Sequence, residues 1–187
     1  MINRDMSVFE IKKDLEGKGD FVQLDHLNRL LNHRTSDDVR RFAYSKIAEI
    51  YEKKGMYTDA AKMCHNLAII SVAFSEKKRY HLKESELYIK EGKLERANEA
   101  MKKAMTEANA PERAEIYATV KEFYRKEAEI SIIKKRKNNA VKIYEKLLEM
   151  DISGVERKEI KKKLLGLYEN LGKIKEYMVL KREFEKL

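Results

Sequence analysis

Apolar residues recur every three or four positions along most of this chain, and short polar or glycine-containing stretches interrupt them. That period is typical of amphipathic α-helices, which bury one face and expose the other. The pattern therefore predicts an all-α fold of about ten helices. Its interruptions put these helices at residues 1–16, 21–32, 37–54, 59–73, 76–91, 94–108, 112–135, 140–150, 154–170 and 174–187.

Several of these helices begin near polar residues that can satisfy the free backbone N–H groups of a first turn. The break at residues 109–111 also puts Pro111 at the first helical position, where its missing N–H is not needed. We expect five polar caps: Asp20, the segment 35–38, Thr58 or Asp59, Asn138 with Asn139, and Ser153 with Glu156, the last pair having the spacing of a capping box.

The fourth predicted helix is apolar nearly all round in its second half, from Leu67 to Phe74. A helix of this kind is normally buried on more than one side. We therefore expect it to pack between neighbouring helices or to seal against a second copy of the chain, which would make the protein a homo-oligomer.

A tyrosine, a glycine four residues later and an apolar residue two further on recur at residues 51–57, 88–94 and 168–174. Self-similarity with a period of about 40 residues indicates a helical repeat, whose units bury their apolar faces by stacking. In this interpretation the glycines form turns and the tyrosines pack between helices. The pattern therefore describes architecture rather than a binding motif.

The segment 37–75 resembles a tetratricopeptide repeat, a helix pair with a large residue, a leucine, small residues and aromatics at fixed places. Those places hold Tyr44, Ile47, Ala48, Tyr51, Ala60 and Cys64. Looser copies cover the rest of residues 41–187, with Glu84 where leucine belongs and Lys135 in place of a turn glycine.

The resemblance implies one domain, residues 1–187, folded as a right-handed superhelical stack of antiparallel helix pairs, an α-solenoid. An N-terminal pair at residues 1–36 would precede repeat-like pairs at 37–75, 76–110, 111–152 and 153–187.

Proteins of the tetratricopeptide family usually bind other proteins, often as an extended peptide along the concave groove formed by the first helix of each pair. The resemblance thus implies a non-catalytic scaffold or adaptor with a protein or peptide partner. The positions that would face such a groove are Phe42, Ser45, Glu49, Lys53, Arg79, Leu82, Glu86, Ile89, Arg125, Glu129 and Ile132.

The net charge is +9, of which +7 falls in residues 121–187. The basic runs there are Lys134, Lys135, Arg136, Lys137, Lys161, Lys162 and Lys163. If they form one patch, the alternative function is a basic helical-repeat module that binds nucleic acid or an acidic partner through residues 121–187. Ordinary helix physics explains the same runs, because cations near a helix C-terminus offset its dipole.

The sequence has few cysteines and histidines that could act as nucleophiles or metal ligands. The single cysteine, Cys64, excludes an internal disulfide and a cysteine-built zinc site. Both Cys64 and His81 fall on positions that the repeat packs, so we expect no enzyme, no metal and no cofactor. No apolar stretch approaches the roughly 20 residues of a membrane span, and no signal-peptide pattern begins the chain, which predicts a cytoplasmic protein without a membrane partner.

Overall fold

The computed structural model describes residues 6–184, and this part of the chain forms ten α-helices and no strand. They are α1 (Val8–Leu15), α2 (Asp20–Leu31), α3 (Asp37–Lys53), α4 (Tyr57–Ile70), α5 (Phe74–Glu91), α6 (Leu94–Thr106), α7 (Ala110–Ile133), α8 (Lys137–Glu149), α9 (Gly154–Asn170) and α10 (Ile174–Phe184). The predicted all-α fold is confirmed. The ends of the first and last predicted helices, at residues 1–5 and 185–187, lie outside the described residues.

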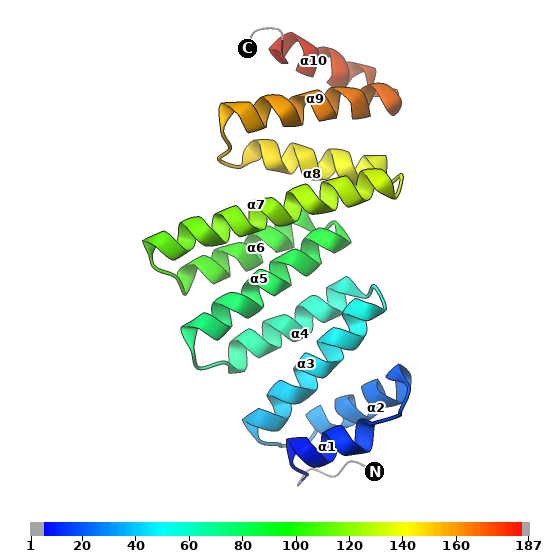
Figure 1. The fold of residues 1–187 in the computed structure, drawn as a ribbon, viewed down its shortest axis with the longest axis vertical. Helices are drawn as coiled ribbons and strands as arrows, with labels where there is room; N and C mark the ends of the chain where they lie inside the picture. Colours follow the sequence, from blue (N-terminus) through cyan, green and yellow to red (C-terminus); the bar gives the residue numbers. More distant parts are fainter. Residues whose placement is uncertain (1–5, 185–187) are drawn as a thin grey trace.

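The helices follow one another along the long axis of the molecule, with the two ends of the chain at opposite ends of the structure (Figure 1). From α2 onward each helix packs against the next, and α5 also packs against α7. Packing between neighbours in this way is compatible with a helical repeat, whose units gain their stability by stacking.

The hairpin turns α3–α4, α5–α6, α7–α8 and α9–α10 share one backbone conformation. In each turn one residue has a positive φ, between 57° and 79°: Gly55, Gly92, Lys135 and Gly172. The N–H of the following residue donates, over 2.8 to 2.9 Å, to the carbonyl five positions earlier, on Tyr51, Tyr88, Ser131 and Tyr168. These bonds are those of the Schellman motif, which ends a helix and satisfies its last carbonyls.

Small residues let the two helices of a hairpin approach closely. Ala60, Ala97 and Ala140, one from each of α4, α6 and α8, are fully buried. In the α5–α6 hairpin the Ser85 hydroxyl donates to the Ala97 carbonyl at 2.9 Å. Successive hairpins are joined as well, since the Tyr124 hydroxyl of α7 donates to a carbonyl of α6 at 3.3 Å.

Two hydrophobic clusters lie along the molecule. The N-terminal cluster consists of residues from α1, α2 and α3: Ile11, Leu15, Leu27, Leu30, Val39, Ala43 and Ile47. The main cluster extends from Ala60 in α4 to Leu180 in α10. Tyr51 packs against both clusters, so α3 connects them.

Three of the predicted caps are wrong, because the N-cap positions of α2, α4 and α8 are Gly19, Met56 and Arg136. Asp20 is the first residue of α2 instead of its cap. Helices α4 and α8 follow Schellman turns, after which the chain is helical again within two residues. Asn139 instead donates its side-chain amide to the Ser131 hydroxyl at 2.9 Å. The capping box of Ser153 and Glu156 is confirmed.

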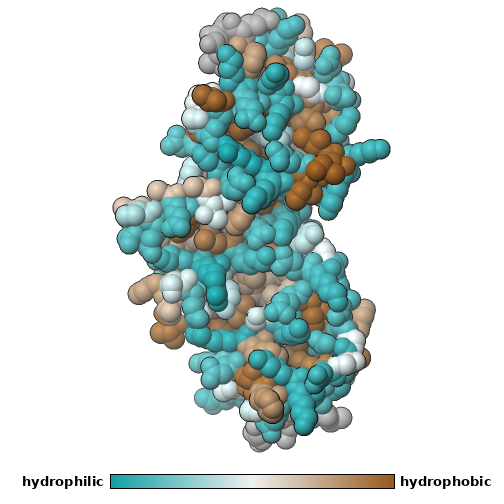
Figure 2. Space-filling model, viewed as in Figure 1, coloured by the Kyte–Doolittle hydropathy of each residue, from teal (hydrophilic) through white to brown (hydrophobic). Residues whose placement is uncertain are grey.

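Helix α4 packs between α3 and α5, as predicted, and Leu67 and Ala68 are buried, but the prediction that the apolar helix continues to Phe74 is wrong. Helix α4 ends at Ile70, and the Ser71 hydroxyl donates to the Leu67 carbonyl at 2.8 Å as the chain becomes extended. Three apolar residues of the segment are exposed, Ile69 by 65%, Val72 by 84% and Phe74 by 65%. On the face drawn in Figure 2, apolar side chains occur in separate small patches among hydrophilic ones.

Replacing the turn glycines with alanine should destabilise the protein by different amounts. A Cβ at Gly55 meets nothing within 4 Å, so Gly55→Ala adds only the strain of a left-handed alanine, about 1–2 kcal/mol. A Cβ at Gly92 would lie 3.0 Å from the Asn139 Oδ1, which is held by the bond to Ser131. We therefore expect Gly92→Ala to lower the free energy of unfolding in urea by more than Gly55→Ala does; equal losses would contradict the contact with Asn139.

Candidate functional site

Three of the predicted groove residues line one open hollow, which we call the N-terminal hollow. Phe42, Ser45 and Glu49 of α3 form one side of it, and the helix α1 with the turn after it forms the other. Its volume is about 900 Å³. Phe42 and Ser45 are half-buried and Glu49 is exposed, so all three are accessible to a ligand.

The N-terminal hollow combines aromatic surface with charged side chains of both signs, Lys12, Lys13 and Lys46 against Glu16 and Glu49. Phe9 of α1 is 77% exposed at its edge. Lys12 and Lys13 also line it, and the Lys12 Nζ lies 5.5 Å from the centroid of the Phe42 ring, within cation–π range. On the α3 side, Lys46 pairs with Glu49 at 3.2 Å.

The remaining predicted groove residues do not line this hollow, and five of them have specific partners. Lys53 pairs with Asp20, Glu86 with Lys83 and Lys90, Arg125 with Glu156, Glu129 with Lys163, and Arg79 donates to the Tyr80 hydroxyl. Ile132 is 39% exposed near the end of α7, and Leu82 is half-buried against the main cluster.

Ile89 was predicted to face the groove, but it is 1% exposed. It lies in the last turn of α5 and is a member of the main cluster, where α5 packs against α4, α6 and α7. No partner can reach it in this structure.

Ion pairs join α3 to α5, α5 to α7 and α7 to α9. We call this set the odd-helix ladder. It consists of Arg41–Glu76 at 3.1 Å, Glu52 with Lys83 and Lys90 at 2.9 Å each, Lys78–Glu112, Glu156 with Arg125 and with Lys121 at 3.3 Å, and Lys163–Glu129 at 3.4 Å. Two of the charged residues predicted to face the groove, Arg125 and Glu129, therefore join helices to each other.

The predicted basic residues lie on two stretches of the chain, the α7–α8 turn and the middle of α9. Lys134, Lys135, Arg136 and Lys137 lie at the α7–α8 turn, where Arg136 pairs with Glu127 at 3.2 Å. On α9, Lys161 and Lys163 pair with different neighbouring helices, Lys161 with Glu183 of α10 at 2.9 Å and Lys163 with Glu129 of α7. Lys162, between them, is exposed.

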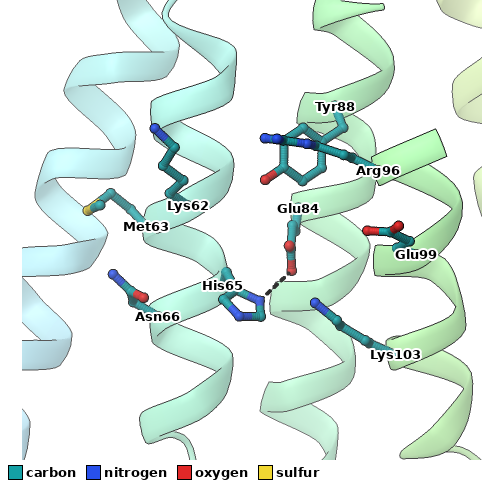
Figure 3. A pocket seen from close by; sticks show the side chains of 9 residues that line it. All are labelled: Lys62, Met63, His65, Asn66, Glu84, Tyr88, Arg96, Glu99 and Lys103. Atoms are coloured by element: carbon teal, nitrogen blue, oxygen red, sulfur yellow. Dashed lines mark hydrogen bonds and ion pairs between the residues drawn. The ribbon is translucent and has the colours of Figure 1, made fainter. Parts of the chain in front are cut away.

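A second hollow, of about 520 Å³, lies over α4, α5 and α6, and His65 and Glu84 line it (Figure 3). With His81, which lies beside them, they form a cluster that the sequence did not predict. His65 of α4 and His81 of α5 both direct their Nδ1 atoms at the Glu84 Oε2, at 3.2 and 2.9 Å. We call these three residues the histidine–glutamate cluster. His81 and Glu84 are buried, whereas His65 is half-buried and lines the hollow.

Part of the histidine–glutamate cluster could be found from the sequence. Glu84 occupies a position where the repeat calls for leucine, and His81 precedes it by three residues, so the two share one face of a helix. His65 is 19 residues from Glu84, and only the packing of α4 on α5 brings it there.

Cys64 is adjacent to His65 in sequence but is 4% exposed and belongs to the main cluster. Burial raises the pKa of its thiol to about 12. The thiolate is the nucleophilic and metal-binding form, so Cys64 is a packing residue at neutral pH.

Comparison with family models, with curated proteins and with solved structures finds no match to this chain. None of the helices between residues 6 and 184 combines the length and the apolar character that crossing a bilayer requires.

Glu156 predicts an acid-dependent loss of stability. Hydrogen bonds from the Ser153 backbone and hydroxyl, with Lys121 and Arg125 beside it, hold the pKa of Glu156 at about 2, although burial acts in the opposite direction. Because the folded-state pKa is below the ordinary 4.5, this contribution is present above pH 4.5 and is lost as the pH falls toward 2.

We therefore expect Glu156→Ala to lower the free energy of unfolding by about 1–2 kcal/mol at pH 7, from the lost cap and ion pairs, and by progressively less in acid. Urea titrations at several pH values measure this. Glu169→Ala, an exposed position on the same helix, is the control, with an expected change within about 0.5 kcal/mol at pH 7. A pH-independent difference for Glu156→Ala would contradict the depressed pKa.

The buried thiol predicts slow labelling. At pH 7 the native protein should react with a thiol-specific disulfide reagent far more slowly than the urea-unfolded protein does, because Cys64 is both buried and protonated. The variant Cys64→Ala with Val72→Cys, whose new thiol is at an exposed position, should react rapidly in the native state. Rapid labelling of native Cys64 would show that α4 opens readily.

Proposed function

We propose that this protein is a non-catalytic interaction scaffold, a tetratricopeptide-like stack of antiparallel helix pairs with a right-handed superhelical course. Support for the repeat comes from the four equivalent Schellman turns and from the fully buried alanines at matching places in α4, α6 and α8. Such stacks present extended surfaces to their partners.

The observation that carries a binding role is the N-terminal hollow. Helix α1 contacts α3 far less closely than the helices of the later hairpins contact one another, and this leaves a space of about 900 Å³ between them. That volume falls within the range of ligand-binding clefts, about 300–1,000 Å³. Phe42 and Ser45 provide a partly buried floor from a rigid helix.

The lining specifies the chemistry of the peptide. Phe9 and Phe42 offer aromatic surface to an apolar or aromatic anchor residue. Lys12 and Lys13 are exposed beside it and would pair with carboxylates next to the anchor. We therefore assign the hollow to a peptide that has a large apolar residue flanked by Asp or Glu.

A nucleic-acid role for residues 121–187 has less support. Arg136, Lys161 and Lys163 form ion pairs with carboxylates. These carboxylates belong to α7 and α10, so the basic side chains are not directed at one site. Phosphate binding requires several free cations on one surface.

Selection from a random peptide display library on the immobilised protein tests the proposal, followed by affinity measurement with fluorescent peptides. We expect peptides of the stated pattern to be enriched. Phe9→Ala should weaken their binding at least about tenfold, which corresponds to about 1.4 kcal/mol, since an aromatic anchor contact is lost. Lys13→Glu should weaken binding most at low salt.

Phe74→Ala is the matched control, because Phe74 is an equally exposed phenylalanine outside the hollow. It should leave binding unchanged. Selection of no peptide family, or equal losses for Phe9→Ala and Phe74→Ala, would disprove this role of the hollow.

A further inference from the structure

The histidine–glutamate cluster has the composition of a metal site. One ligand atom from each of His65, His81 and Glu84 lies within 4.8 Å of the other two. Two imidazoles and one carboxylate form a donor set that zinc uses with a fourth, open position. The donors belong to the adjacent, closely packed helices α4 and α5, which fix their relative placement.

The negative charge of the buried Glu84 carboxylate requires a positive partner. The Glu84 side chain is 5% exposed, and its Oε2 lies within hydrogen-bond distance of one ring nitrogen of each histidine. Burying an ionised carboxylate is costly unless it is paired with a cation or coordinates a metal. A divalent ion bound by the two imidazoles and Glu84 would supply such a charge.

Two of the three separations are close to those of a tetrahedral site. Two ligand atoms that are each about 2.0–2.1 Å from a tetrahedral zinc ion lie about 3.3 Å from each other. The observed separations of the two Nδ1 atoms from the Glu84 Oε2 are 3.2 and 2.9 Å. The third separation, between the two imidazoles, is within 4.8 Å, so side-chain movements that shorten it would bring all three atoms onto one ion.

The cluster also has an entry path. His65 has a side-chain exposure of 33%, and the hollow of about 520 Å³ opens beside it and Glu84 (Figure 3). The fourth coordination position would face this hollow and hold water. Lys62, Arg96 and Lys103 also line it, against the single additional carboxylate of Glu99, and their charge weakens cation binding.

We propose that His65, His81 and Glu84 bind one zinc ion between α4 and α5. The ion joins two successive helix pairs, since α4 closes the first tetratricopeptide-like pair and α5 begins the second. It stabilises the folded state in proportion to its binding, because the unfolded chain does not hold the three ligands together. Given the surrounding lysines and arginine, we expect a dissociation constant in the micromolar range.

Isothermal titration of the chelator-treated full chain with zinc chloride at neutral pH tests this. We expect one site per chain and a rise in melting temperature on zinc addition. Cobalt(II) in place of zinc should give the visible absorption of a tetrahedral ion. His65→Gln should weaken zinc binding at least about 10–100-fold, and Glu84→Gln should do the same.

His65→Gln is the decisive variant because the side chain is half-buried and its loss should leave the fold intact, as circular dichroism without zinc will show. The chain has four histidines, and the double variant His26→Gln with His33→Gln removes the two outside the cluster, so it should bind zinc as the native chain does. The proposal is overturned if submillimolar zinc shows no saturable binding, if His65→Gln binds as tightly as the native chain, or if the double variant loses the site.

Discussion

A single residue with left-handed backbone conformation at each hairpin turn sets the course of the whole chain. Its two Schellman hydrogen bonds end one helix and aim the next helix back along it. The buried alanines of α4, α6 and α8 reach the preceding helix only because the return direction is the same each time. At α7–α8 a lysine adopts this conformation, with a φ of 57°, which costs about 1–2 kcal/mol relative to glycine. The turn forms there nevertheless, so the packing of α7 on α8 offsets the strain.

The odd-helix ladder limits what the face of α3, α5, α7 and α9 can do. Its charged residues connect these helices to one another. Each exposed pair contributes little alone, about 0–1 kcal/mol, but the pairs also hold their side chains in place. A partner that used Glu86 or Arg125 would have to displace an existing ion pair. The ladder does not extend to α1, which lies beside the N-terminal hollow.

Much of the fold could be predicted from the sequence because helix periodicity and turn chemistry are local. The turns at Gly55, Gly92 and Gly172 and the capping box at Ser153 follow from residues close together in the chain. The wrong caps at α4 and α8 were local errors, because a Schellman turn precedes each helix, whereas other failures depended on longer-range geometry. A run of apolar residues does not reveal where α4 ends, which is why Val72 was expected to be buried.

The candidate sites show the same division. The position of Phe42, Ser45 and Glu49 on one side of α3 follows from helical spacing, but the hollow above them depends on how far α1 lies from α3. Likewise, His81 and Glu84 share a helix face by their spacing, whereas the approach of His65 depends on the register between α4 and α5. Registers between helices are set by side-chain packing across the interface, and no short stretch of sequence records them.

The two hydrophobic clusters, joined through Tyr51, divide the molecule into parts of unequal cohesion. Helices α1 and α2 rest on a small cluster and on one side of α3, so they can detach while the long main cluster stays folded. Amide hydrogens in α1 and α2 would then exchange by a local opening, and those of α5 to α8 by near-global unfolding. A ligand bridging α1 and α3 would act as a clamp on this detachable end: it would slow amide exchange in α1 and α2 and would raise the free energy of global unfolding by the same amount.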